Sequence, residues 1–146
     1  MSPAEPAARW VYDPHRGGRP IPAAVRRQIE GRLRSYAEWR FAGLYRDLDV
    51  RFRGQFCYVD LYRDPGPLPE EWPPPAWSES REEALARLRA TPLHLCRLRH
   101  LGGGDRFSFA FYSYASERYE PSALATGDLV GSPEDALEVC AGLRLE

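Results

Sequence analysis

The sequence contains no lysine and no asparagine, and its only isoleucines are Ile21 and Ile29. All 20 basic residues are therefore arginine. Because the codons for lysine, asparagine and isoleucine are rich in A and T, these absences indicate a GC-rich genome more than selection for the forked guanidinium that binds phosphates and carboxylates. The number of arginines consequently says little about function, and only their positions carry information.

Long apolar runs are absent as well. No stretch approaches the ~18 apolar residues that a membrane span needs, and the start, MSPAEPAARW, lacks the apolar segment of a signal peptide. We therefore expect a cytoplasmic protein without membrane contact. A chain of 146 residues suits one domain, and it can bury roughly 68–70% of its unfolded surface without a disulfide or a metal.

Cysteine is scarce and never closely paired. Cys57, Cys96 and Cys140 stand among apolar residues, which is typical of buried, reduced thiols. His94, Cys96 and His100 would share one face of a predicted strand, and Cys57 would lie on a neighbouring strand, so these four are the residues from which a zinc site could be built. Because they lack closely spaced ligand pairs, we predict no structural metal.

Motifs that bind cofactors or activate nucleophiles are also missing. The chain has no G-x-G-x-x-G, no P-loop lysine, no HExxH and no G-x-S-x-G. The run Gly102-Gly103-Gly104-Asp105 lies between two predicted strands and does not open a helix, so we interpret it as a turn and not as a phosphate-binding loop. No cofactor is predicted.

Proline and apolar spacing divide the chain. Residues 1–20 hold four prolines and no sustained periodicity, which predicts an irregular arm, and residues 21–146 form one domain with a proline-rich loop at 64–79. A helix is expected over 22–42, where Val25, Ile29 and Leu33 recur every four residues. Two further helices should begin after the N-cap serines Ser80 and Ser132.

Alternating apolar and polar residues predict the strands. We expect one hairpin at 48–62, a second at 93–115, and a fifth strand around 123–126. The order α-β-β-α-β-β-β-α predicts an α+β fold, with a mostly antiparallel sheet of four or five strands and about three helices, mainly on one face. Six side chains should line the helix-covered face of the sheet, together with Val25, Ile29 and Leu33 of the first helix. They are Val50, Phe52, Val59, Leu61, Cys96 and Leu98.

The other face of the first hairpin combines arginine with aromatic rings, and it is our predicted binding surface. It would consist of Arg51, Arg53, Phe56, Tyr58, Tyr62, Arg97 and Arg99. We expect this face to bind a protein partner or a second subunit. The alternative is single-stranded RNA, because rings can stack on bases and arginines can bind phosphates. Residues 1–63 hold 12 arginines and 7 carboxylates, whereas residues 64–146 hold 8 and 14, so the basic half could meet either an anionic partner or the acidic half.

A hydrolase or nuclease is a further alternative. His15 and Asp13 could exchange protons in the N-terminal arm, with Asp49 or Asp60 as a second carboxylate, provided that these groups converge. The spacing alone does not show that convergence.

Four runs of the chain resemble a family of small uncharacterised bacterial proteins: RRQIEGRLRSYAEW, LDVRFRGQFCYVDLY, TPLHLCRLRH and RFSFAFYSYASERYEP. The resemblance covers most of residues 20–140. It implies a self-standing bacterial domain, and it implies no activity, ligand or catalytic residue.

Overall fold

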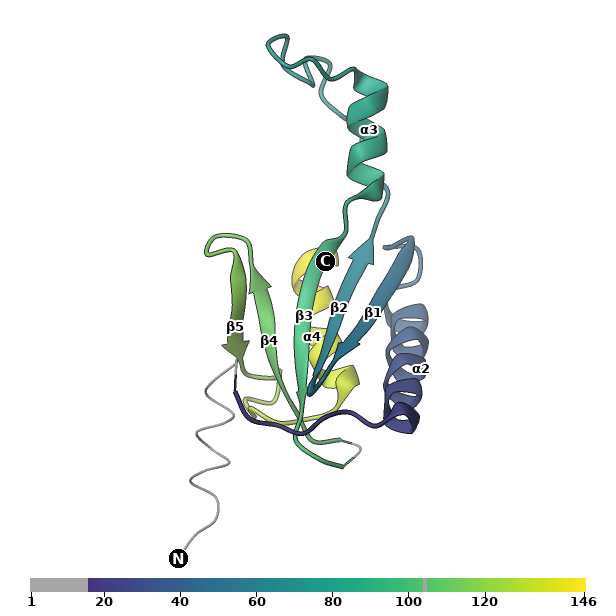
Figure 1. Ribbon diagram of the computed structural model, residues 1–146. Coiled ribbons are helices and arrows are strands. Elements are labelled where there is room, and N and C mark those ends of the chain that lie inside the picture. Colours follow the sequence, from purple (N-terminus) through teal and green to yellow (C-terminus); the bar gives the residue numbers. More distant parts are fainter. Residues whose placement is uncertain (1–15, 104) are drawn as a thin grey trace, which may run out of the picture.

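The computed structural model describes residues 16–103 and 105–146 of the chain. An antiparallel sheet of five strands is combined with three helices, in the predicted order, so the expected α+β fold is confirmed (Figure 1). The elements are α2 (Ala23–Arg40), β1 (Asp47–Arg53), β2 (Phe56–Tyr62), α3 (Arg81–Ala90), β3 (Leu93–His100), β4 (Phe107–Ser113), β5 (Arg118–Ser122) and α4 (Pro133–Leu145).

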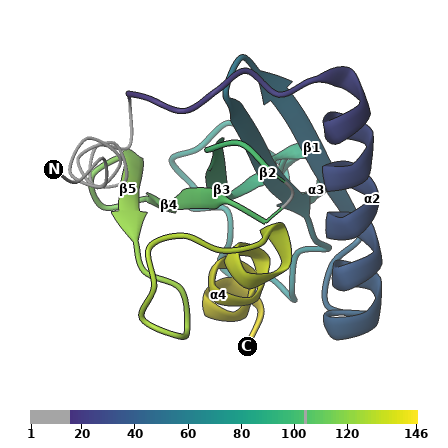
Figure 2. The same ribbon diagram turned by 90° about the horizontal axis from the view of Figure 1, so that it is seen from below.

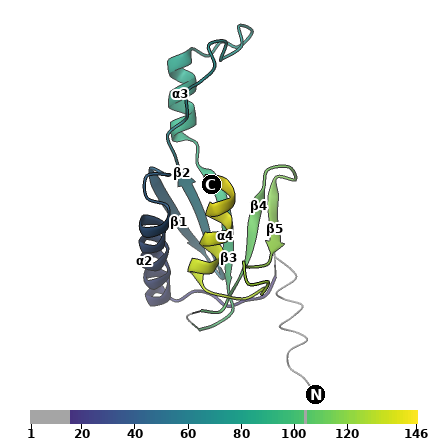
Figure 3. The ribbon, with the colours of Figure 1, turned by 180° about the vertical axis from the view of Figure 1, so that it is seen from behind.

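Each strand of the sheet pairs with its neighbour in the sequence, in the order β1-β2-β3-β4-β5. Helices α2 and α4 both pack on one face of the sheet, and Figure 3 shows α4 lying across it. Figure 2 shows the segment before α2 on the opposite side of the sheet from α4. We call that opposite side the open face, because no helix of the described chain covers it.

The core lies between the sheet and these two helices. Ile29, Leu33 and Ala37 of α2 are buried in it, as the predicted four-residue spacing requires. The predicted core residues all belong to this core or pack against it: Val25, Ile29, Leu33, Val50, Phe52, Val59, Leu61, Cys96 and Leu98. Burying one such aliphatic side chain contributes roughly 1.5–3 kcal/mol.

Helices α3 and α4 begin as the sequence predicts. The Ser80 hydroxyl accepts a hydrogen bond from the backbone N–H of Glu83, and the Glu83 carboxylate accepts one from the backbone N–H of Ser80. Ser132 and Asp135 make the same reciprocal pair at α4, which has Pro133 in its first turn. These capping boxes satisfy backbone N–H groups that a helix otherwise leaves without a partner. No helix in the described residues is long and apolar enough to cross a membrane.

The fifth strand is displaced from its expected position. It spans Arg118–Ser122 and not 123–126. The segment after it closes a turn, in which Leu124 donates to the carbonyl of Asp128 and Gly127 donates to the carbonyl of Leu124. Pairing across the β4–β5 hairpin, with Tyr112 opposite Tyr119, fixes the strand earlier in the chain than the local sequence indicated.

A β-bulge in β3 reverses the side-chain alternation. Cys96 pairs with Val59 and His94 pairs with the next residue, Asp60, so Leu95 is an extra residue on β3. His94 therefore lies on the open face with Asp60, while Cys96 and the buried Leu95 belong to the core. The prediction that His94 and Cys96 share one face is wrong for this reason.

Residues 64–90 form a projecting arm. Figures 1 and 3 show the proline-rich loop and α3 extending beyond the end of the sheet, between β2 and β3. Ala84 is the buried residue of α3. Two helices thus cover the sheet, and the third stands away from it.

Candidate functional site

The open face carries the predicted arginine and aromatic side chains. Strand register places Arg51, Tyr58 and Arg97 in one row across β1, β2 and β3. The next row contains Arg53, Phe56 and Arg99. Tyr62, opposite Asp47, lies on the same face further along β2. Whether this surface binds a ligand stays a prediction.

Two of the arginines are packed into the sheet surface and are not available to a ligand. Arg97 is 8% exposed, and its Cζ lies 4.2 Å from the ring centre of Phe56 and 5.1 Å from that of Tyr119. Arg99 is 2% exposed and donates from Nε to the Ser108 hydroxyl at 3.0 Å and from Nη1 to the carbonyl of Arg16. The sequence placed both residues on the correct face but did not reveal their burial.

One end of the open face is closed by the segment before α2. Arg19 donates to the carbonyl of His100 at 2.8 Å, and Ile21 donates to that of Gly54 at 3.0 Å. At Gly18, whose φ is +89°, a Cβ would lie 2.8 Å from Arg99 Cγ. A glycine at this position therefore lets the segment approach the sheet and cover Arg99.

A buried carboxylate lies in the open face. Asp60 is 2% exposed, and Oδ2 accepts a hydrogen bond from Arg51 Nη2 at 2.8 Å. Oδ1 lies 3.0 Å from Nδ1 of His94. Arg51 also pairs with Asp49 at 3.0 Å. The charge of Arg51 is therefore balanced by two carboxylates, and Asp60 holds the half-buried His94 ring in a fixed orientation.

Tyrosine rings surround this carboxylate. Tyr119 lies 5.8 Å from Tyr58 and 5.0 Å from Tyr112 between ring centres, and Tyr112 lies 4.8 Å from both His94 and Tyr114. Burial, and then the charge of Asp60, raises the pKa of Tyr119 well above its usual range. The sequence alternation in 107–113 indicated the face of Tyr112, but only the β4–β5 register brings Tyr119 to it.

A cleft of about 630 Å³ opens at the other end of this face, at the base of the projecting arm. Its lining includes His94 and Tyr114 together with arm residues such as Pro67 and Leu68. His94 therefore both pairs with the buried carboxylate of Asp60 and lines the cleft. Sequence reasoning missed this site, because the bulge at Leu95 was needed to bring His94 beside Asp60.

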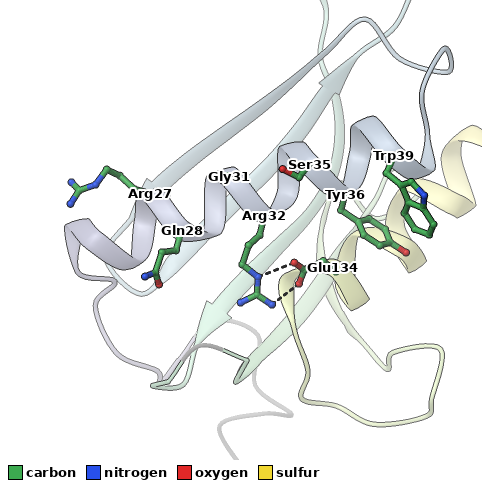
Figure 4. A pocket seen from close by; sticks show the side chains of 8 residues that line it. All are labelled: Arg27, Gln28, Gly31, Arg32, Ser35, Tyr36, Trp39 and Glu134. Atoms are coloured by element: carbon green, nitrogen blue, oxygen red, sulfur yellow. Dashed lines mark hydrogen bonds and ion pairs between the residues drawn. The ribbon is translucent and has the colours of Figure 1, made fainter.

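A second cleft, of about 670 Å³, runs along α2 and is drawn in Figure 4. Arg32 crosses it to Glu134 of α4, with hydrogen bonds of 2.8 and 2.6 Å, and also pairs with Asp105 at 2.6 Å. Trp39, at one end, is 75% exposed. The charge of Arg32, at the centre of this cleft, is therefore balanced by two carboxylates.

The residues considered for a metal site do not converge. Among the residues that the structure describes, no group of three or more His, Cys, Asp or Glu could hold a metal ion. Cys57 and Cys96 are buried under the helices, and burial raises the pKa of Cys57 well above its usual range. His100 packs on the Phe107 ring at 5.3 Å, at the far end of β3 from His94. His15 and Asp13 lie outside the described residues.

Comparison of the chain with protein-family models, with curated proteins and with solved structures finds no match. The resemblance to small bacterial proteins therefore stays a prediction.

Proposed function

We propose that this chain is a cytoplasmic protein-interaction domain that pairs with a second copy of itself, the projecting arm of each copy lying on the open face of the other. The observation that carries the proposal is the arm. It extends beyond its own sheet, and its helix buries only Ala84 within the described chain. The three cysteines are free thiols, as in proteins of reducing compartments.

Contacts within the arm give it a defined shape. Arg81 donates to the carbonyls of Leu68, Pro69 and Trp72 at 2.6, 2.7 and 3.1 Å. Arg87 pairs with Glu79 at 2.9 Å. A surface ordered before binding loses less conformational entropy when a partner is bound. An arm held in this way, without a large core of its own, is suited to docking.

Aromatic residues with accessible ring surface lie on both the arm and the open face. Trp77 of the arm is 49% exposed and packs edge-on against Trp72, with ring centres 5.0 Å apart. On the open face, Tyr58 and Tyr112 are half-buried. Tryptophan, tyrosine and arginine dominate binding energy at protein interfaces.

The arm is acidic, with six carboxylates and three arginines in residues 64–90. On the open face, the exposed Arg53 is available to pair with one of these carboxylates. A second copy supplies both parts, and a two-fold axis would repeat the contact, as symmetric dimers require.

Single-stranded nucleic acid fits this face less well. A polyanion is bound by cations that release its counterions. Arg51 is balanced by Asp49 and Asp60, and Arg97 and Arg99 are buried. The arrangement therefore favours a protein surface with mixed charges.

Sedimentation equilibrium of the full chain tests the pairing. We expect a concentration-dependent dimer that weakens as salt is raised, because opposite charges meet. Trp77→Ala and Arg53→Glu should each raise the dissociation constant at least about tenfold. Trp39→Ala, which removes an exposed tryptophan from α2, is the matched control and should change nothing.

A wild-type chain that stays monomeric up to a concentration on the order of 1 mM would overturn the proposal. A monomer that binds single-stranded RNA in a salt-dependent manner, measured by fluorescence anisotropy and lost in Tyr58→Ala, would favour the nucleic-acid alternative.

A further inference from the structure

We propose that Asp60, His94 and Tyr114 form an acid–base site that hydrolyses uncharged esters of apolar carboxylic acids in the cleft at the base of the arm. This inference does not depend on the pairing of two copies.

The general base would be His94. Its Nδ1 lies 3.0 Å from Oδ1 of Asp60, so the imidazole is anchored at one nitrogen and can accept a proton at the other, Nε2. Asp60 is itself fixed, because Arg51 binds its second oxygen at 2.8 Å. A buried carboxylate in this position selects the tautomer of the imidazole and stabilises the imidazolium that forms during the reaction.

Tyr114 supplies a hydrogen-bond donor beside this base. Its hydroxyl oxygen accepts a hydrogen bond from the backbone N–H of His94 at 2.8 Å, which leaves the hydroxyl hydrogen to donate to a ligand. The two rings stack at 16°, with centres 6.2 Å apart. The guanidinium of Arg144 lies 5.1 Å from the Tyr114 ring centre, and a cation there favours negative charge developing near the hydroxyl.

The walls of the cleft indicate the class of substrate. They are mainly apolar, with Pro65, Pro67, Leu68, Leu88 and Leu93. The carboxylate of Asp64, also in the lining, lies 3.7 Å from Arg46 and 3.4 Å from Arg89. The volume of about 630 Å³ is in the range of small-molecule sites. Arg63 also lines the cleft, and its Nη1 donates to the carbonyl of Arg144 at 3.2 Å. An apolar acyl group fits these walls better than a phosphate, which would need several cations.

The reaction needs no cofactor. A water molecule attacks the ester carbonyl carbon while His94 Nε2 takes one of its protons, and the resulting oxyanion accepts a hydrogen bond from Tyr114. The bond from carbon to the alcohol oxygen then breaks, and the proton on His94 passes to that oxygen. The products are a carboxylic acid and an alcohol, which account for the ester and the water consumed.

Hydrolysis of p-nitrophenyl butyrate by the full chain tests the site. We expect steady turnover that falls on the acid side of the pH profile, because a protonated imidazole cannot accept a proton. His94→Gln should lose at least about a hundredfold in kcat/KM. Tyr114→Phe should lose roughly tenfold, mostly in kcat, since its donor acts on the oxyanion. Tyr45→Phe is the matched control and should keep the wild-type rate, because Tyr45 packs against the core and its hydroxyl donates to Glu38 of α2, not into the cleft.

Asp60 is a positioning residue, and it needs a separate readout. In Asp60→Asn kcat should fall while KM stays near the wild-type value, and Asp60→Glu should restore part of the lost kcat, because the imidazole depends on a carboxylate to fix its tautomer and orientation. The other groups that face this pair are Arg51, Tyr112, Tyr114, Tyr119 and Arg144. Circular dichroism should show that each variant is folded.

Turnover that is no faster than in buffer would overturn the proposal. A folded His94→Gln variant that keeps the wild-type rate would do the same, as would a single burst of p-nitrophenol without further turnover.

Discussion

At the scale of single residues, Arg97 illustrates how this chain uses arginine inside a sheet surface. Its guanidinium is packed against Phe56 and Tyr119, and its side chain is almost entirely buried. We therefore expect Arg97→Ala to lower the free energy of unfolding by about 1–3 kcal/mol, through lost packing and lost cation–π contact. The exposed Arg53→Ala should stay within about 0.5 kcal/mol. Urea unfolding of both variants measures the difference, and equal effects would contradict this account.

The stability of the fold should depend on pH through the carboxyl group of Glu134. Burial is the largest single influence on this carboxyl and raises its pKa, but the hydrogen bonds from Arg32, the backbone and Ser132, together with the charge of Arg32, outweigh burial, so the pKa is lowered. A folded pKa below the unfolded value of about 4.3 contributes stability that is present above that value and is lost as the pH falls through the folded pKa. Glu134→Gln should therefore destabilise the fold at pH 7 by about 1 kcal/mol.

The same comparison at acid pH checks the sign. Below the folded pKa of Glu134 the wild type and Glu134→Gln should unfold at the same urea concentration, because both side chains are then neutral. Glu82→Gln, in the arm, is the control. It should unfold at the same urea concentration as the wild type at both pH 7 and acid pH. A gap that persists at acid pH would mean that the carboxylate charge is not the cause.

At the scale of elements, the two capping boxes make a matched pair. Ser132 starts α4, whose face fills the core, whereas Ser80 starts α3 in the projecting arm. Loss of an N-cap serine reduces stability by about 0.5–2 kcal/mol. We expect Ser132→Ala to lower the melting temperature of the whole domain. Ser80→Ala should lose helical circular dichroism below that temperature without moving it. A shift as large as that of Ser132→Ala would place α3 within the cooperative core.

Local signals in the sequence were sufficient for most elements. Serine caps, the four-residue stripe of α2 and the alternation of β1 and β2 depend on neighbouring residues, and they predicted those elements and the covered face. The bulge at Leu95 could not be predicted in this way, because it depends on how β3 pairs with β2. The same limit applies to β5, whose position follows from its pairing with β4. The site at His94 was missed because it depends on this pairing.

At the scale of the whole molecule, the arm is an insertion between two strands that already meet. Leu61 of β2 pairs with Leu93 of β3, so a short turn can join these strands once the arm is removed. We expect a chain in which a glycine-rich turn replaces residues 64–91 to fold with a nearly unchanged melting temperature and to sediment as a monomer. A dimer of unchanged strength would show that the arm is not part of the contact.

The sequence could not predict that α3 stands away from the sheet. Its composition is compatible with a helix on the sheet, because Ala84, Leu85 and Leu88 would give it an apolar side. Whether such a helix packs on its own domain depends on the loops that connect it, here the proline-rich segment that Arg81 holds in place.

The pairing of each strand with its neighbour in the sequence has a consequence for the order of folding. Every strand pairs with its neighbour in the sequence, so the sheet can grow from hairpins that close short loops. In contrast, α2 and α4 are joined by Arg40 with Glu138 and by Tyr36 with Glu138, across about a hundred residues of chain. The junction of the two helices would then form late, after the transition state. Weakening this junction would speed unfolding and leave the refolding rate nearly unchanged. The contacts between α2 and α4 would therefore determine the lifetime of the native state.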